Sequence, residues 1–309
     1  MRIRELFLIG FICIGTSGLA QQRPINSMYM FDMLLINPAY AGNHVQLSAT
    51  AIYRNQWVNF PGAPVTSSFS IQNGFFQDKV GVGLIVSNDQ IGIHNDMGVY
   101  MSYAYKIKMN SGTLSMGLEA GFNNIKSDFD LLNIRDDSDA NLSGLLSEFY
   151  PNFGTGFYFS NKQWYLGVSV PRLINNDLMI QTQDAGLPSL AEMKRDYLIS
   201  FGTTMYLNKD VMLKPSTMIR MQEGSPINYD LNANLIWKET MSVGLSYRNI
   251  DSIVGLFELK LHENFHIGYA YDRTVSGISR FSDGSHEIML NYRIKIPLWH
   301  NGVECPAFF

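Results

Sequence analysis

The sequence is poor in cysteine, in charged residues and in long hydrophobic runs. Two cysteines, Cys13 and Cys305, occur in 309 residues, and charged residues make up 16% of the chain. Because Cys13 lies in an N-terminal stretch typical of a removed export signal, the mature chain would keep one cysteine and could form no internal disulfide. The body of the chain has no apolar run of about 20 residues, which excludes a helical membrane span.

Residues 1–20 have the features of a signal peptide. Arg2 and Arg4 precede an apolar stretch at residues 6–14, and residues 18–20 are small enough for cleavage. We therefore expect the mature chain to begin at Gln21. The cysteine of this stretch is not at the cleavage position, so no lipoprotein anchor is expected.

The mature chain is predicted to be one acidic domain. Removal of residues 1–20 takes away two of 23 basic residues and one of 27 acidic residues, which leaves 21 against 26 and a net charge near −5. This balance disfavours a nucleic-acid partner. No Pro/Ser-rich stretch or run of like charges divides the chain into separate domains.

Residues 45–296 consist of short segments in which apolar and polar residues alternate. Met97, Met101 and Tyr103 occupy odd positions of one segment, whereas Ser102 and Lys106 fall between them. A period of two is typical of strands with one apolar face, which meets lipid in a transmembrane barrel. The mean hydropathy is only −0.03, because every second residue would face water or a polar lumen. The sequence therefore predicts an all-β fold, a transmembrane outer-membrane β-barrel.

We count about fourteen antiparallel strands, an even number as is usual in bacterial barrels. Their expected starts are Val45, Thr66, Val80, Asp96, Gly112, Pro151, Gln163, Asp196, Val211, Ile227, Met241, Ile253, Phe265 and Gly284. Glu119 and Asp230 lie in the middle of strands. Both should face the lumen, because a charge against lipid would cost about 2 kcal/mol or more.

The connections between the expected strands differ in length. Those after even-numbered strands are mostly tight, at residues 73–79, 110–111, 161–162, 208–210, 238–240 and 262–264. Those after odd-numbered strands tend to be longer, notably 125–150 and 172–195, although 222–226 and 249–252 are short. Short periplasmic turns and longer outer loops are characteristic of barrels in the outer membrane, where we expect the chain to lie.

Two segments depart from the alternating pattern. Residues 21–44 precede the first strand, and the turn-forming residues at 37–42 predict an ordered cap or plug. Residues 54–64 combine a cation, an amide, an indole and two prolines at the end of the first strand or in the first outer loop. The expected organisation is a signal peptide (1–20), a cap or plug segment (21–44), a barrel (45–296) and a C-terminal tail (297–309).

The segment at residues 54–64 has two interpretations. It could form a rigid patch suited to contacts with a partner. Alternatively, its residues could only set turns, and Arg54 could pair with an inward acid such as Glu119 or Asp230 to satisfy a polar lumen. A rigid loop serves folding and recognition alike, so both interpretations stay open here.

Residues His262 to His266 match the zinc-protease motif HExxH. The motif works on a helix, which places both imidazoles on one face as zinc ligands and the glutamate beside a water. Here strand-like residues flank it, and a tight turn would point the histidines in unrelated directions. Asp136, Asp137 and Asp139 lack the glycine and terminal glutamate of a calcium loop. We therefore expect no metal site, no cofactor site and no catalytic residue.

An ordered set of short motifs covers most of the mature chain. It comprises Tyr-Met near the N-terminus, Asn-Pro-Ala-Tyr-Ala-Gly at 37–42, Arg-x-Gln-Trp at 54–57, Gly-Ala-Pro at 62–64, Gly-Val-Ser-Val-Pro-Arg-Leu at 167–173, Gly-Tyr-Ala-Tyr-Asp at 268–272 and His-Glu-Ile at 286–288. This set resembles the PorP/SprF family of type IX secretion outer-membrane proteins from the Bacteroidetes. Asp32 departs from the family, where an asparagine is common. Residues 297–309 extend beyond the usual end, so the assembly signal is either 292–294 or the terminal Phe309.

The resemblance implies a non-enzymatic barrel component that helps the type IX system to export or retain a large C-terminally tagged surface protein, such as a gliding adhesin. Its partners would be type IX secretion components, that secreted protein and outer-membrane lipid. The positions carried over, as family markers or partner-binding candidates, are Asn37, Pro38, Ala41, Gly42, Arg54, Gln56, Trp57, Gly62, Pro64 and Arg172.

A different class of function is a passive porin or hydrophobic-solute transporter, with the N-terminal segment as its hatch. That alternative would require conduction of ions or binding of a lipid-like solute. A metalloprotease would require His262 and His266 to bind zinc together.

Overall fold

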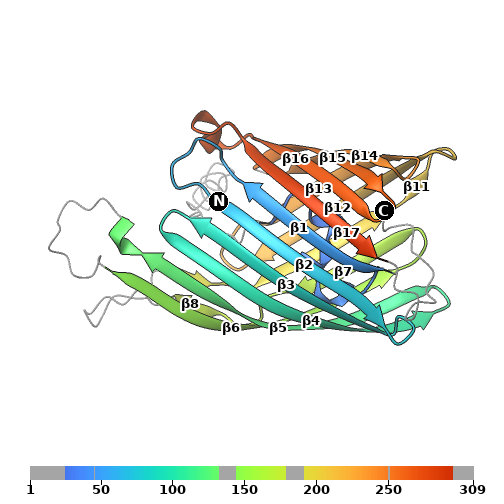
Figure 1. The fold of residues 1–309 in the computed structure, drawn as a ribbon, viewed down its shortest axis with the longest axis horizontal. Helices are drawn as coiled ribbons and strands as arrows, with labels where there is room; N and C mark the ends of the chain where they lie inside the picture. The colour runs from blue at the N-terminus through green and yellow to red at the C-terminus, as the bar shows by residue number, and fades with distance from the viewer. Residues whose placement is uncertain (1–24, 45, 132–143, 179–190, 250, 295–309) are drawn as a thin grey trace, which may run out of the picture.

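The wall of the molecule is one antiparallel sheet that closes on itself as a barrel (Figure 1). This computed structural model describes residues 25–44, 46–131, 144–178, 191–249 and 251–294. The wall strands pair in chain order, and the pairing of β1 with β17 closes the barrel. Closure leaves no open edge in the sheet, as lipid requires of strands that cross a membrane.

Within the described residues, fourteen strands make up the wall. They are β1 (Leu47–Asn55), β2 (Val65–Phe75), β3 (Val80–Ile91), β4 (His94–Met109), β5 (Gly112–Asp128), β6 (Leu145–Ser160), β7 (Trp164–Val170), β10 (Asp196–Thr203), β12 (Val211–Gln222), β13 (Asn228–Trp237), β14 (Met241–Arg248), β15 (Ser252–His262), β16 (Phe265–Thr274) and β17 (Ser285–Ile294). β11 (Met205–Tyr206) continues β10 along β12, and β8 (Asn176–Leu178) pairs with β9 (Ala191–Met193) in a separate hairpin. The predicted all-β barrel of about fourteen strands is confirmed.

The helices are short 3₁₀ turns. Three of them lie in residues 25–44, which we call the N-terminal segment: η1 (Tyr29–Phe31), η2 (Met33–Leu35) and η3 (Pro38–Tyr40). η4 (Phe129–Leu131) follows β5, and η6 (Gly277–Arg280) lies between β16 and β17. In the described ranges, no helix is long and apolar enough to cross a membrane.

The predicted strand starts agree closely with the structure. Thirteen of the fourteen lie within two residues of an observed start, and six coincide with it: Val80, Gly112, Asp196, Val211, Met241 and Phe265. Val45 itself lies outside the described residues, and β1 begins at Leu47. The agreement follows from the lipid, which forces one side of every strand to be apolar and so makes the period of two easy to recognise.

The hairpin of β5 and β6 is the exception. The sequence predicts β6 to begin at Pro151, whereas it begins at Leu145, and β5 continues to Asp128. A proline lacks the N–H that a ladder needs and is therefore usual at the first residue of a strand. Instead Pro151 lies opposite Phe122 within the ladder. The hairpin consequently projects beyond its neighbours, as the green strands at the left of Figure 1 show.

The two faces of the wall separate apolar from polar side chains. Leu118, on the outward side of β5, is 64% exposed, while the next residue, Glu119, is 6% exposed and faces the lumen. Asp230 is 3% exposed on the inward side of β13. The predicted inward orientation of both acids is therefore confirmed.

The two rims of the barrel differ in their connections. At one rim the links are tight, as at residues 110–111 and 238–240, where Lys238 and Glu239 have φ angles of 49° and 51°. Such left-handed pairs are typical of two-residue hairpin turns. At the opposite rim, residues 129–144 and 171–195 make long links. Because outer-membrane barrels have short periplasmic turns and longer outer loops, we call this second rim the outer rim.

The N-terminal segment lies inside the barrel and supplies much of its hydrophobic core. Met28, Tyr29, Leu34 and Tyr40 are at most 2% exposed, and η3 packs against β4, β5 and β6. Tyr40 meets Tyr158 of β6 edge to face, with 5.4 Å between ring centroids. The lumen of the described barrel is thus occupied by the chain's own N-terminal segment.

A charge on the lipid-facing side of β5 should weaken the barrel. We expect Leu118→Arg to lower the free energy of unfolding in lipid vesicles by about 2–4 kcal/mol, since an arginine in the apolar belt loses its hydration. The matched variant Met109→Arg, at the turn end of β4 and so near the membrane interface, should change the free energy of unfolding by only about 0–1 kcal/mol. Denaturant unfolding followed by tryptophan fluorescence measures both values. Equal effects would contradict the assigned lipid face.

Candidate functional site

Three buried charges inside the barrel form a hydrogen-bonded cluster in the lumen. Arg54 projects inward from β1 and lies 2.6 Å from a carboxylate oxygen of Asp272 on β16 and 2.9 Å from one of Glu287 on β17. All three side chains are at most 2% exposed. β1, β17 and β16 are neighbours in the wall, and Arg54 lies directly opposite Glu287. We call Arg54, Asp272 and Glu287 the charge cluster.

The start of the N-terminal segment contributes further hydrogen bonds to the charge cluster. The two carboxylate oxygens of Glu287 accept hydrogen bonds of 2.8 Å from the backbone N–H groups of Ser27 and Met28. The Ser27 hydroxyl donates to Asp272 at 2.8 Å and accepts from Arg54 at 2.8 Å. Two buried carboxylates beside one guanidinium need such additional donors, because an uncompensated charge in a low dielectric is strongly unfavourable. The segment is therefore part of the charge compensation of the wall.

A second set of contacts joins the segment to β2. The Ser70 hydroxyl donates to the Asp32 carboxyl group, and the Gln72 amide lies 3.5 Å from the other Asp32 oxygen. The Gln72 side-chain oxygen accepts the N–H of Gly42 at 3.1 Å. Lys106, near the turn end of β4, donates to the carbonyl oxygen of Gly42. The segment thus extends from Arg54, near the outer end of β1, to Lys106, near the periplasmic rim.

Burial shifts the titration of two groups in the segment. The pKa of Asp32 is raised from 3.8 to about 6, because desolvation outweighs the opposing hydrogen bond from Ser70 and the positive charge of Arg293. The pKa of His44 is lowered well below its usual value, first by burial and then by the positive charges of Arg293 and Lys106. Burial therefore shifts the titration of both groups toward their neutral forms.

Asn37 and Pro38 begin η3 and fix it to the wall. The Asn37 side-chain oxygen accepts the N–H of Ala39 at 2.9 Å as an N-cap, and Pro38 takes the first helical position, where its missing N–H is not needed. The Asn37 amide group also donates to the carbonyl oxygen of Phe157 on β6 at 3.0 Å. One residue therefore both shapes the segment and attaches it to the barrel.

Glycines of the wall allow the segment to approach closely. A Cβ atom at Gly81 of β3 would collide with the Ala41 carbonyl oxygen, and one at Gly117 of β5 would collide with the backbone of Ala39. Gly42 has a φ angle of 60° and passes directly against β2 and β3, so no other residue fits there without strain. These contacts explain part of the high glycine content.

Four predicted positions lie in the link between β1 and β2 at the outer rim. Its ends are joined by a 2.9 Å hydrogen bond from the N–H of Gln56 to the carbonyl oxygen of Pro64. The N–H of Trp57 donates to the Ser285 hydroxyl at 3.1 Å, and the carbonyl oxygen of Gly62 accepts at 3.1 Å from the β3–β4 turn. The link is therefore held in place by both neighbouring connections.

The structure separates Arg54 from the rim positions. It corrects the expected pairing with Glu119 or Asp230: Glu119 accepts a hydrogen bond from Ser102 at 2.8 Å, and Asp230 pairs with Arg248 at 3.2 Å. Alternation identifies which acids face inward but not which strands are neighbours, and β5 and β13 do not adjoin β1. Arg54 belongs to the lumen and not to an exposed patch.

Arg172 lies just after β7, which ends at Val170, and so at the outer rim as predicted. The N-terminal markers Asn37, Pro38, Ala41 and Gly42 all lie in the lumen. The ten predicted positions therefore form two groups, one inside the barrel and one at the outer rim.

The HExxH residues adopt the predicted strand and turn arrangement. His262 is exposed at the end of β15, whereas His266 is buried on β16 and lies 3.2 Å from Glu258. Among the described residues, no group of three or more His, Cys, Asp and Glu side chains is arranged to hold a metal ion. Asp136, Asp137 and Asp139 lie outside the described residues.

Sequence reasoning missed the acidic half of the charge cluster. Asp272 ends the motif at 268–272, and Glu287 is the centre of the motif at 286–288, so a signal was present in the ordered set. Nothing in the alternation connects these acids to Arg54, because that contact depends on closure of the barrel between β1 and β17.

Loss of the guanidinium should destabilise the whole barrel. We expect Arg54→Ala to lower the free energy of unfolding by about 3–5 kcal/mol, because Asp272 and Glu287 would stay buried without their cation. Arg280→Ala, in the exposed turn η6, should change it by no more than about 0.5 kcal/mol. Urea unfolding in detergent micelles measures both variants, and similar small effects would show that the charge cluster contributes little.

The raised pKa of Asp32 makes stability depend on pH. The contribution of Asp32 to the free energy of unfolding is complete below its pKa in the unfolded chain, about 4. It is lost as the pH rises through the pKa of Asp32 in the folded barrel, about 6. A shift of about two units corresponds to about 3 kcal/mol. Asp32→Asn keeps an oxygen acceptor for Ser70 but removes the charge. The free energy of unfolding of this variant should therefore equal that of the wild type near pH 4 and exceed it near pH 8. The wild type and the variant both contain His44, so its titration cancels in the difference between their unfolding free energies. If that difference did not change with pH, this role of Asp32 would be refuted.

Comparison with known proteins places these features in a family. No curated protein matches the sequence. The chain is similar to the solved structure of the Ralstonia pickettii toluene transporter TbuX, with 8% identity and a TM-score of 0.48 over 87% of this chain and 93% of the transporter. It is also similar to the structure of the CymD monoaromatic hydrocarbon channel, with 10% identity and a TM-score of 0.48 over 90% of this chain and 96% of the channel. Because both TM-scores are below 0.5, the architecture described above rests on the strand pairings of this chain itself. A family model, described as type IX secretion system membrane protein PorP/SprF, matches residues 18–292. The match covers both the lumen and the rim positions, and the chain therefore belongs to the PorP/SprF family of type IX secretion system membrane proteins.

Proposed function

We propose that this chain is a non-enzymatic accessory component of the type IX secretion system that supports export or surface attachment of one large C-terminally tagged protein, such as a gliding adhesin. Family membership supports its place in the secretion system. The observation that carries the proposed role is the filled lumen, in which the N-terminal segment is bonded to the charge cluster. A filled barrel suits docking or assembly better than passage of a polypeptide.

Release of the N-terminal segment would be energetically unfavourable. Glu287 would lose both backbone donors, Asp272 would lose the Ser27 hydroxyl, and Met28, Tyr29 and Leu34 would lose their packing in the lumen. Burial of one large apolar side chain typically contributes about 1.5–3 kcal/mol, so the loss of all three is strongly unfavourable. This supports a static plug over the hatch of a passive porin or hydrophobic-solute transporter.

The outer rim supplies the surface that we assign to partners. Trp57 is half-buried on the fixed link between β1 and β2, and Phe60 on the same link is 38% exposed. Aromatic side chains on a rigid loop are favoured in protein interfaces because little conformational entropy is lost on binding. Gln56, Gly62 and Pro64 would shape this surface, and Arg172 would contribute a cation at the same rim.

Export through a cleaved signal peptide at residues 1–20 is part of the proposal. Cleavage before Gln21 would leave four residues ahead of the N-terminal segment. Removal of the apolar leader would allow the segment to enter the lumen as the barrel closes.

Deletion of the gene tests the role in secretion. We expect trypsin shaving and mass spectrometry of intact cells to show loss of one large C-terminally tagged protein from the surface. The wild-type gene should restore that protein, whereas a Trp57→Ala and Arg172→Ala double variant should restore less than half of it. Outer-membrane levels of the double variant should be normal, because neither residue belongs to the charge cluster.

The matched control for the double variant is Trp237→Ala, at the periplasmic end of β13, which should restore secretion fully. An unchanged surface proteome after deletion would overturn the secretion role. Ion conductance of the purified wild-type barrel in planar bilayers, at the level of an open channel, would favour the porin alternative instead.

A further inference from the structure

Two hollows on the outer surface of the barrel lie side by side and share one residue. The first has a volume of about 300 Å³ and lies between the β3–β4 turn and the projecting β5–β6 hairpin. The second has a volume of about 560 Å³ and lies over β17, β1, β2 and β3. Met97 of β4 lines both. The two hollows therefore adjoin at Met97, and we treat them together as one continuous depression on the outside of the wall.

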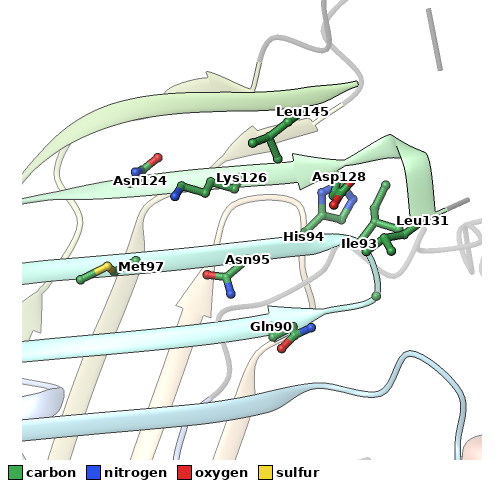
Figure 2. Close-up of a pocket in the computed structure, with 11 residues that line it drawn as sticks. Gln90, Ile93, His94, Asn95, Met97, Asn124, Lys126, Asp128, Leu131 and Leu145 are labelled. Atoms are coloured by element: carbon green, nitrogen blue, oxygen red, sulfur yellow. The ribbon is translucent and has the colours of Figure 1, made fainter. Parts of the chain in front are cut away.

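The first hollow has a mixed lining, in which a group of polar side chains lies beside apolar ones such as Ile93, Leu131 and Leu145. Gln90 of β3 lies opposite Asn95 of β4, and Asn95 lies opposite Lys126 of β5, so these three residues form one outward row across three strands. Asn124 lies one step below Lys126 on the same face of β5. Figure 2 shows these side chains around the hollow, with Asp128 on the side of the outer rim. Together with Asn124, the row offers one ammonium group and three carboxamides, and Asp128 adds a carboxylate on the side of the outer rim.

The second hollow is apolar and lies within the lipid-facing belt. Ala51 and Ser67 are small and leave space at its floor, while Phe69, Ile288 and Leu290 border it. In the register of β1 and β2, Ala51 lies opposite Phe69, so a small residue sits beside a large one on the same outward face. A gap of this kind in the lipid-facing wall fits a flexible hydrocarbon chain.

The depth of the two hollows matches the layers of a membrane. Tyr53, which borders the apolar hollow, is an outward tyrosine near the outer end of β1, where aromatic side chains typically mark the membrane interface. Met97 lies opposite Asn88, and the polar row begins at the next outward pair toward the outer rim, Gln90 and Asn95. The polar hollow is therefore at headgroup level, and the apolar hollow is below it.

We propose that the continuous depression binds one phosphorylated glycolipid of the outer leaflet, which goes beyond the proposed role in secretion. One acyl chain occupies the apolar hollow over Ala51 and Ser67. The headgroup occupies the polar hollow, where the Lys126 ammonium pairs with a phosphate. The carboxamides of Gln90, Asn95 and Asn124 supply donors and acceptors for sugar hydroxyls, which a glycerophospholipid headgroup would use less fully.

Lipid counting by native mass spectrometry tests the proposal. The full-length mature barrel in detergent micelles is titrated with monophosphoryl lipid A, dioleoyl phosphatidylglycerol or dioleoyl phosphatidylcholine. We expect one lipid A molecule per barrel, at least fivefold weaker binding of phosphatidylglycerol, and no saturable binding of phosphatidylcholine.

Two pairs of variants separate the headgroup and chain contacts. Lys126→Ala should weaken lipid A binding at least fivefold, whereas Lys162→Ala, in the exposed β6–β7 turn, should not. Ala51→Phe fills the apolar hollow and should weaken binding similarly, whereas Ala120→Phe, on the lipid-facing side of β5 outside both hollows, should not. Each variant is compared at equal barrel content, measured by circular dichroism.

Three results would overturn the proposal. Equal binding of lipid A and phosphatidylglycerol would remove the role of the carboxamides in selecting a sugar. Unchanged binding in both Lys126→Ala and Ala51→Phe would place the lipid elsewhere. Saturable binding of phosphatidylcholine at the strength of lipid A would show that the depression does not select a charge.

Discussion

A carboxylate buried inside a lipid-embedded wall must be matched by cations and N–H donors, and much of this structure follows from that constraint. Asp272 and Glu287 face Arg54 across the closure of the barrel. One guanidinium does not satisfy two carboxylates, so Ser27 and Met28 supply the remaining donors. Closure of the sheet and insertion of the N-terminal segment are thereby coupled in a single network.

The same coupling connects the fold to its role in secretion. Wall glycines such as Gly81 and Gly117 admit the backbone of the segment, and Asn37 fastens it to β6. A lumen filled in this way leaves the rims and the outer surface as the places where we propose that partners and lipids bind. The fixed link after β1 and the depression over β1 to β5 lie on those two surfaces.

The sequence was sufficient to predict the wall but not the contacts inside it. Lipid imposes an apolar face on each strand, so alternation located Val80, Gly112 and Phe265 as strand starts and Glu119 as an inward acid. The start predicted at Pro151 was wrong, because β6 begins six residues earlier and a proline is tolerated in the part of β6 that runs past its last pair with β7, Thr155 and Val170. The partner of Arg54 could not be predicted, since contacts between residues more than 200 positions apart depend on how the barrel closes. Asp272 and Glu287 lie in motifs of the ordered set, but neither acid was selected as a site position.

Backbone hydrogen exchange of residues 25–44 in the lipid-embedded barrel tests the central claim most directly. If the charge cluster and the wall hold the N-terminal segment in the lumen, the amides of Ser27 and Met28 will exchange as slowly as those of the central wall strands. Exchange of these amides at the rate of an unstructured peptide would show that the segment is not bound there, and would contradict the account.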